Sequence, residues 1–222
     1  MKFTRKQLDR YSRQIILKKV GIIGQKKLLK SSVLIVGAGG LGSPIAIYLA
    51  ALGIGEIGIV DKDSVEISNL NRQIIFETND INKSKSTTAI KKISKINPDI
   101  KLKSFNKKLT ANNINQIAKK YDLLIDGSDN FRTRFLINDY CLKNKKILIS
   151  GAISKFDGQV YTFNFNKKKS PCLRCFIPEI PNNPDVDNCE HDGILGPLAG
   201  IIGAIQANEV VKELLEIGDT LC

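Results

Sequence analysis

The chain has 222 residues, of which 42% are hydrophobic and 25% are charged, with five cysteines and a formal net charge of +12. The length fits one large domain, and no stretch approaches the roughly 18 apolar residues needed to cross a bilayer. The polar N-terminus lacks the apolar core of a signal peptide, so we expect a cytoplasmic protein that neither enters a membrane nor carries a disulfide framework.

The positive charge alone is compatible with a nucleic acid, an anionic nucleotide or an acidic protein as the partner. The lysines are spread along the whole chain, there is no Trp, and no basic stripe alternates with aromatic residues. The pattern therefore favours solvated lysines on helix surfaces over a nucleic-acid-binding protein.

The first two thirds of the chain predict helices alternating with short strands. Residues 4–30 have the pattern of one amphipathic helix, which ends at Ser31 and Ser32. Further helices are expected from the glycine-rich stretch to residue 51 and at 83–95, 112–119 and 132–144, and strands at 33–36, 56–60, 101–105, 123–125 and 147–149. This alternation predicts a Rossmann-like, doubly wound α/β sheet whose N-terminal part is parallel.

The pattern changes after Gly151. Residues 158–165 alternate as in an antiparallel strand, 176–192 are rich in Pro, Asn and Asp and predict a long mobile loop, and 194–217 predict mostly helix. We expect a single domain over 1–222, with an N-terminal helical segment (1–30), a nucleotide-binding half (31–151) and a second half (152–222) that contains the antiparallel part.

A glycine-rich turn follows the first strand. Gly37, Gly39 and Gly42 have the spacing G-x-G-x-x-G and precede a helix. The first glycine permits a tight turn, the second lets a phosphate approach the backbone, and the third lets the helix pack on the strand. The helix N-terminus attracts the phosphates, and Asp61, at the end of the next strand, can accept hydrogen bonds from ribose hydroxyls. The motif predicts a nucleotide site.

Charged residues further along favour ATP over a dinucleotide, because ATP carries more negative charge. The segment after the ribose-binding acid supplies Asn69 and Arg72, and Lys85 follows; Arg72 and Lys85 are candidates to neutralise the β- and γ-phosphates. Asp129 and Asn130 follow the fourth strand, where an acid that faces the crevice can hold Mg²⁺. Taken singly, each residue is better explained as a surface charge or, for Asp129, as a helix cap; their order along the chain favours the ATP site.

Several stretches together resemble the MoeB/ThiF (HesA) family, the bacterial relatives of ubiquitin-activating enzymes. They occur in the family's order from residue 10 to about 217, at 10–15, 37–42, 61–63, 68–73, Lys85, 128–130, 172–175 and 193–197. The resemblance implies a homodimeric adenylyltransferase that binds ATP and Mg²⁺. It implies that Arg13 reaches across the dimer to the partner's ATP, and that the nucleotide site is lined by Gly40, Asp61, Asn69, Arg72, Lys85 and Asp129.

The resemblance also implies the reaction. The C-terminal carboxylate of a ubiquitin-like sulfur-carrier protein, which ends in Gly-Gly, attacks the α-phosphorus of ATP, and pyrophosphate leaves. Arg13, Arg72 and Asp129 are the expected catalytic residues, because the step needs positioning and charge stabilisation rather than a nucleophile on the enzyme. In the family a separate donor protein then supplies sulfur. Residues 152–222 are expected to bind the carrier, of either the thiamin or the molybdopterin type.

The cysteines give weaker signals. Cys172 and Cys175 form a C-x-x-C pair, which is half of a tetrahedral zinc site. The family has a second pair near its C-terminus, whereas this sequence has only Cys222 there, so either the chain stops before that pair or this member lacks the site. Cys189 lies in the expected loop, where relatives can form a covalent bond with the carrier; a free loop thiol explains it equally well. Cys141 is expected in the core.

Three other functions stay open at this stage. An NAD-dependent oxidoreductase shares the glycine motif, although Arg72, Lys85, Asp129 and the C-x-x-C pair argue against it. A related enzyme could activate an amino acid or a tRNA base, and a partner-binding domain would perform no catalysis.

Overall fold

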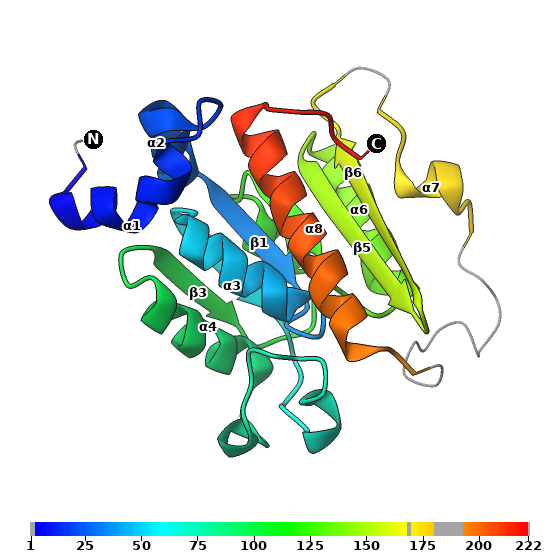
Figure 1. Cartoon of the computed structure of the whole chain (residues 1–222). Coiled ribbons are helices and arrows are strands. Elements are labelled where there is room, and N and C mark those ends of the chain that lie inside the picture. The colour runs from blue at the N-terminus through cyan, green and yellow to red at the C-terminus, as the bar shows by residue number, and fades with distance from the viewer. Residues whose placement is uncertain (1–2, 168–169, 180–192, 222) are drawn as a thin grey trace.

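The structure is a computed structural model that describes residues 3–167, 170–179 and 193–221. Six strands form one sheet in the order β3-β2-β1-β4-β5-β6 (Figure 1). They are β1 (Ser32–Val36), β2 (Glu56–Val60), β3 (Lys101–Phe105), β4 (Leu123–Asp126), β5 (Ile147–Ser154) and β6 (Asp157–Asn164). The first five strands pair in parallel, and β6 pairs antiparallel with β5. The predicted fold class is confirmed.

The helices cover both faces of this sheet. They are α1 (Arg5–Ile15), α2 (Gly21–Lys30), α3 (Gly42–Leu52), α4 (Lys85–Ile96), α5 (Ile114–Ala118), α6 (Phe131–Lys143), α7 (Leu173–Phe176) and α8 (Gly196–Leu215), with 3-10 turns at Ile67–Asn69 and Thr78–Asp80. Helices α3, α4 and α8 pack on one face, and α5 and α6 pack on the other (Figure 1). No helix within the described residues is long and apolar enough to cross a membrane.

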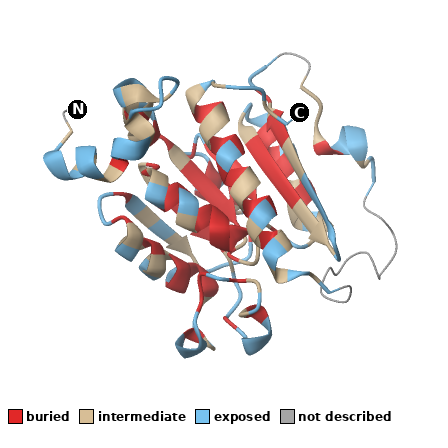
Figure 2. Cartoon of the chain, in the orientation of Figure 1, coloured by how far each residue is buried: buried red, intermediate tan, exposed pale blue. Residues whose placement is uncertain are grey.

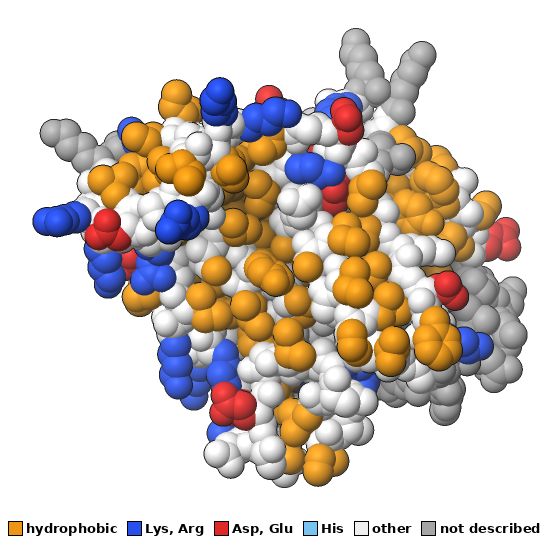
Figure 3. All heavy atoms as spheres, viewed as in Figure 1, with side chains coloured by type: hydrophobic (Ala, Val, Ile, Leu, Met, Phe, Trp, Pro, Cys, Tyr) orange, Lys and Arg blue, Asp and Glu red, His pale blue; other side chains and the backbone are white. Residues whose placement is uncertain are grey.

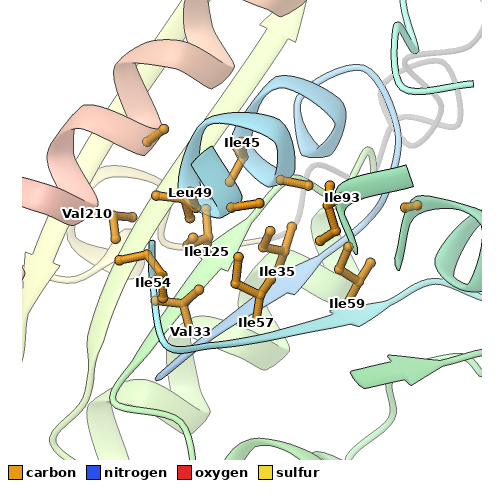
Figure 4. Packing of buried hydrophobic residues seen from close by; sticks show 14 of the residues in the cluster. Val33, Ile35, Ile45, Leu49, Ile54, Ile57, Ile59, Ile93, Ile125 and Val210 are labelled. Carbon is orange, nitrogen blue, oxygen red and sulfur yellow. The ribbon is translucent and has the colours of Figure 1, made fainter. Parts of the chain in front are cut away.

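The central strand β1 explains why the sheet is buried on both sides. Its residues alternate between faces, so that Val33 and Ile35 join the core under α3 and α8 while Leu34 and Val36 join the core under α5 and α6. Figure 4 shows the first of these cores, in which β-strand isoleucines meet side chains of α3, α4 and α8. Buried residues accordingly concentrate in the sheet and the helix faces toward it (Figure 2). Cys141 lies fully buried in the second core, as expected.

The prediction of one helix over residues 4–30 is wrong, because the structure has two helices, α1 and α2. The amides of Gln14 on α1 and Gln25 on α2 both donate to the carbonyl oxygen of Leu52, at 2.8 and 3.0 Å. This shared acceptor at the C-terminus of α3 holds the two helices together, and α2 starts at Gly21, whose φ of 56° ends any continuous helical path.

The second half differs from the prediction in two places. The sequence predicts residues 147–149 as a strand that ends at Gly151, whereas β5 continues to Ser154, because it pairs along its whole length with β6. The short helix α7 was not predicted; it overlaps the start of the expected loop 176–192. Residues 180–192 of that loop lie outside the described residues.

Candidate active site

A cleft of about 860 Å³ lies at the carboxyl ends of the parallel strands, beside the point where β1 is flanked by β2 and β4. This reversal of strand order is where doubly wound sheets bind their ligands. The structure brings most of the predicted nucleotide residues together here, namely Gly37, Gly39, Gly40, Asp61, Asn69, Arg72, Lys85, Asp129 and Asn130.

The glycine-rich turn joins β1 to α3. Gly37 has a φ of 93°, and a Cβ there would lie 2.6 Å from the carbonyl oxygen of Gly127. A Cβ on Gly42 would lie 2.0 Å from the carbonyl oxygen of Gly37, so this glycine closes the turn and does not itself line the cleft. At Gly39 the nearest atom to a Cβ is the Gln73 amide nitrogen at 3.8 Å. No protein atom therefore lies close enough to require glycine at residue 39, and the space beside it can take a ligand.

Asp61 directly follows β2 and faces the turn. One carboxylate oxygen accepts a hydrogen bond from the Ala38 N–H and the other accepts one from the Asp63 N–H, both at 2.8 Å. Burial raises the pKa of Asp61, while the two backbone hydrogen bonds and Lys85 act in the opposite direction. Each oxygen keeps a second lone pair, which suits a ribose hydroxyl donor.

The segment after β2 supplies the predicted polar residues. The Arg72 guanidinium donates to the Ser68 carbonyl oxygen at 3.0 Å and to the Asn71 side chain at 3.1 Å. Asn69 is buried, and its side-chain oxygen accepts a 3.2 Å hydrogen bond from the Glu66 N–H. Lys85 begins α4 and is only 9% exposed. These side chains are thus ordered at the cleft by local contacts.

Sequence reasoning missed five further cations of the cleft wall. Seven lysines and arginines line it, against the four acids Asp61, Asp63, Glu66 and Asp129, so cations outnumber acids by three. The missed residues are Lys62, Lys107, Lys108, Arg132 and Arg134. The position of Lys107 and Lys108 just after β3 is a signal that was available in the sequence. The surplus suits a polyanionic ligand.

Asp129 lies in the loop between β4 and α6. Asn130, not Asp129, caps α6: its side-chain oxygen accepts the Thr133 N–H at 2.9 Å. The Asn130 amide also donates to one Asp129 oxygen at 3.1 Å, and Asp129 is exposed at the cleft. One carboxylate together with substrate phosphates is a common way to bind Mg²⁺, so this residue fits that ion. The described residues contain no group of three or more acidic, His or Cys side chains that could hold a metal ion.

One predicted catalytic residue of the described part of the chain does not line this cleft. Arg13 is exposed on α1 and is not part of the cleft wall of its own chain. Cys189 lies outside the described residues, as does Cys222.

Cys172 and Cys175 lie next to each other at α7, with their sulfur atoms 3.8 Å apart. A tetrahedral zinc ion bound at about 2.3 Å places two sulfurs about 3.8 Å apart, so the pair fits two of its four ligand positions. Helix α7 is attached to α6, because the Arg174 guanidinium donates twice to Asp139, at 2.9 and 2.7 Å, and lies over the Phe135 ring. Neither cysteine lines the cleft.

A doubly wound sheet, a glycine-rich turn after β1 and a cleft at the reversal of strand order define a Rossmann-type protein of the nucleotide-binding class. The family model described as "ThiF family" matches residues 11–221. The chain therefore belongs to the ThiF family, which confirms the predicted resemblance.

Two curated relatives and one solved structure illustrate the similarity. A sulfur carrier protein adenylyltransferase of Thermus thermophilus is 42% identical over 224 residues, which cover 100% of this chain and 83% of that protein. A probable molybdopterin-synthase adenylyltransferase of Porphyra purpurea is 49% identical over 215 residues, which cover 96% of this chain and 56% of that protein. E. coli MccB with MccA-N7isoASN has a TM-score of 0.82 at 22% identity, over 96% of this chain and 66% of that one, and shows the same fold.

The chain thus spans most of one curated relative and little more than half of the other. Both relatives are named adenylyltransferases, in agreement with the predicted nucleotidyltransferase class.

Proposed function

We propose that the protein uses ATP to adenylate the C-terminal carboxylate of a ubiquitin-like sulfur-carrier protein that ends in Gly-Gly. Membership of the ThiF family and the names of the curated relatives support this reaction. The observation in the structure that carries it is the cleft at the strand ends, where the glycine-rich turn, Asp61 and a surplus of cations meet.

Each part of the cleft has a role in this proposal. Asp61 accepts hydrogen bonds from the ribose, and the N–H groups at the start of α3 together with Arg72 and Lys85 bind the phosphates. Asp129 would hold Mg²⁺, which when bound neutralises charge on the phosphates. The carrier's carboxylate oxygen forms a bond to the α-phosphorus as the bond from that phosphorus to the bridging oxygen of pyrophosphate breaks. The products are the acyl-adenylate and pyrophosphate, and no enzyme nucleophile is used.

ATP–pyrophosphate exchange in the presence of the carrier tests the reaction. We expect exchange with wild type and a strong loss with Asp129→Ala and with Arg72→Ala. Supplying a thiamin-type and a molybdopterin-type carrier in parallel identifies the preferred substrate. No exchange by wild type with either carrier would contradict the proposed function, and full exchange by Asp129→Ala would remove the metal-binding role.

We infer further that the protein acts as a homodimer in which Arg13 serves the partner's cleft. Arg13 is exposed and does not line the cleft of its own chain. Apolar surface suited to self-association is also present: Figure 3 shows hydrophobic side chains gathered over α3 and α8, where Tyr48 and Ile201 are 52% and 58% exposed.

A mixing experiment tests this arrangement. Arg13→Ala and Asp129→Ala proteins are each expected to be inactive, whereas a re-associated mixture should regain roughly a quarter of wild-type activity, because half of its dimers contain one intact site. No recovery in a mixture shown to contain mixed dimers would contradict a role for Arg13 in the partner's site.

The cysteines carry two subordinate proposals. Cys172 and Cys175 would supply two thiolate ligands to a structural zinc ion, supported by their 3.8 Å sulfur separation. The Cys189 thiolate would attack the carbonyl carbon of the acyl-adenylate, so that a thioester with the carrier forms as the acyl–phosphate bond breaks and AMP leaves. A conjugate that persists without reductant in wild type and disappears in Cys189→Ser, with adenylation retained, is the expected result.

A further inference from the structure

Arg134 is the fourth residue of α6 and lines the cleft, although it is only 9% exposed. Its guanidinium donates a 2.8 Å hydrogen bond to the carbonyl oxygen of Ser128. This oxygen belongs to the residue directly before Asp129. A buried cation therefore holds the backbone of the loop 127–130 from the side of α6.

The same loop is fixed from the side of the sheet. Asp126 is 1% exposed, and one of its carboxylate oxygens accepts the N–H and the hydroxyl of Ser128, at 3.0 and 2.6 Å. The other oxygen accepts the Ser150 hydroxyl at 2.9 Å. Asp126 thus accepts hydrogen bonds from the N–H and the hydroxyl of Ser128, and Arg134 donates one to the Ser128 carbonyl oxygen. Every backbone and side-chain polar group of Ser128 is therefore held.

The position of Arg134 is unfavourable unless it serves the cleft. A cation near the N-terminus of a helix opposes the helix dipole. Among the described residues no carboxylate forms an ion pair with Arg134, and its one hydrogen bond leaves four of its five N–H donors available. A buried charge without an anionic partner is costly, which indicates that the side chain is retained for its contact with Ser128 and for the anionic ligand of the cleft.

We propose that Arg134 is a positioning residue of the adenylation reaction, which holds Ser128 so that the Asp129 carboxylate is placed for the Mg²⁺ of ATP. The proposal rests on the proposed function for the identity of the ligand. Arg134 acts through the loop 127–130 and not on the reacting atoms. Holding Ser128 requires the planar set of N–H donors and not only the positive charge, because a planar guanidinium can bind the carbonyl oxygen and still face the cleft.

Arg134→Lys tests this distinction, because it keeps the charge and removes the planar set of donors; Arg5→Lys on α1 is the matched control outside the cleft. ATP affinity is measured by calorimetry with Mg²⁺ and with EDTA, without a carrier. For Arg134→Lys we expect the gain in affinity from Mg²⁺ to fall by about tenfold, as for other residues that support a metal ligand. Affinity in EDTA should change by less than about twofold, since the charge is retained.

Amide hydrogen exchange provides a readout that needs neither metal nor activity. The N–H of Gly127 donates to the Val36 carbonyl oxygen and that of Ser128 to Asp126, so both amides are protected in wild type. In Arg134→Lys these two amides should exchange faster, while the amides of β1 and β4 keep their protection and show that the fold is intact.

Unchanged exchange at Gly127 and Ser128 together with a full Mg²⁺ effect in Arg134→Lys would overturn the positioning role. If Arg134→Lys does not fold, the same two measurements are made on Arg134→Gln. The exchange of the Gly127 and Ser128 amides is then compared with that of the β1 amides, and equal protection would overturn the role. Failure of wild type to adenylate any carrier would instead overturn the proposed function, and the loop and Mg²⁺ measurements would still test Arg134 itself.

Discussion

The Asp61 carboxylate at the end of β2 accepts a 2.8 Å hydrogen bond from the backbone N–H of Ala38 in the glycine-rich turn after β1. Ala38 is 2% exposed, so in the folded protein its N–H is shielded from solvent and relies on this bond. A residue predicted to bind ribose therefore also builds the turn against which the phosphates would lie. Its removal should affect both the folded protein without ligand and the binding of nucleotide.

Asp61→Ala should lower the free energy of unfolding by about 1–3 kcal/mol, because the Ala38 N–H is left without a partner. Part of that loss is offset, since burial raises the pKa of Asp61 and its charged form is costly to bury. Urea denaturation measures the change, with the exposed acid substitution Asp157→Ala as the control. Thermal protection by ATP with Mg²⁺ should disappear in Asp61→Ala alone; retained protection would contradict the ribose role.

Two glycines of the same turn should separate folding from binding. A Cβ at residue 42 would overlap the Gly37 carbonyl oxygen at 2.0 Å, so Gly42→Ala should destabilise the protein by several kcal/mol, about 3 or more. Gly39→Ala meets only an atom at 3.8 Å and should leave the melting temperature within a few degrees, while weakening ATP binding at least about tenfold by blocking phosphate approach. Gly200→Ala, with open space around it, is the control. Normal ATP affinity in Gly39→Ala would show that phosphates do not approach this residue.

The ion pair that attaches α7 should depend on pH. The hydrogen bond from Arg174 lowers the pKa of Asp139 from its ordinary value of 3.8. The pair therefore stabilises the fold above pH 3.8, and this contribution is lost as the pH falls through the lowered value of the folded state. Because both side chains are nearly half exposed, Asp139→Asn should cost less than about 1 kcal/mol at neutral pH.

Urea denaturation of wild type and Asp139→Asn at neutral pH and at a series of acidic values gives that difference directly. The two proteins should converge at the acidic end. A difference that grows on acidification would mean that another group carries the effect.

Zinc content tests the C-x-x-C pair. Cys172→Ala and Cys175→Ala should each remove the bound zinc, measured by mass spectrometry of the metal, because thiolates supply the ligands. Cys141→Ala is the control, since this cysteine is fully buried in the core and burial raises its pKa. Equal zinc content in all four proteins would contradict ligation by the pair.

The sequence predicts β2 and β3 with the bounds that the structure has, because each is a short run that ends where polar loop residues begin. The division between α1 and α2 could not be found in this way. Ile15, Ile16 and Leu17 continue the apolar pattern, and the acceptor that holds both helices, the Leu52 carbonyl oxygen, lies far along the chain.

The candidate site likewise contains residues that the sequence identifies and one that it does not. Gly37, Gly42 and Asp61 are recognisable because their motif is local and lies between a strand and a helix. Arg134 is not, because its contact with Ser128 depends on how α6 is oriented over the loop before it. Its position four residues after the Asn130 cap is compatible with that contact but does not distinguish it from any other arginine on a helix.

Helix α8 covers the same sheet face as α3, and Ile202, Ala207 and Val210 complete a core that begins with Val33 in β1. Gly203 permits this approach, since a Cβ there would lie 2.7 Å from the Leu41 carbonyl oxygen. During translation the strands that form the cleft therefore leave the ribosome well before the helix that covers them. A nascent chain that ends after β5 has α3 and α4 on this face, but the part that α8 contacts, over β5, stays uncovered until α8 has been synthesised.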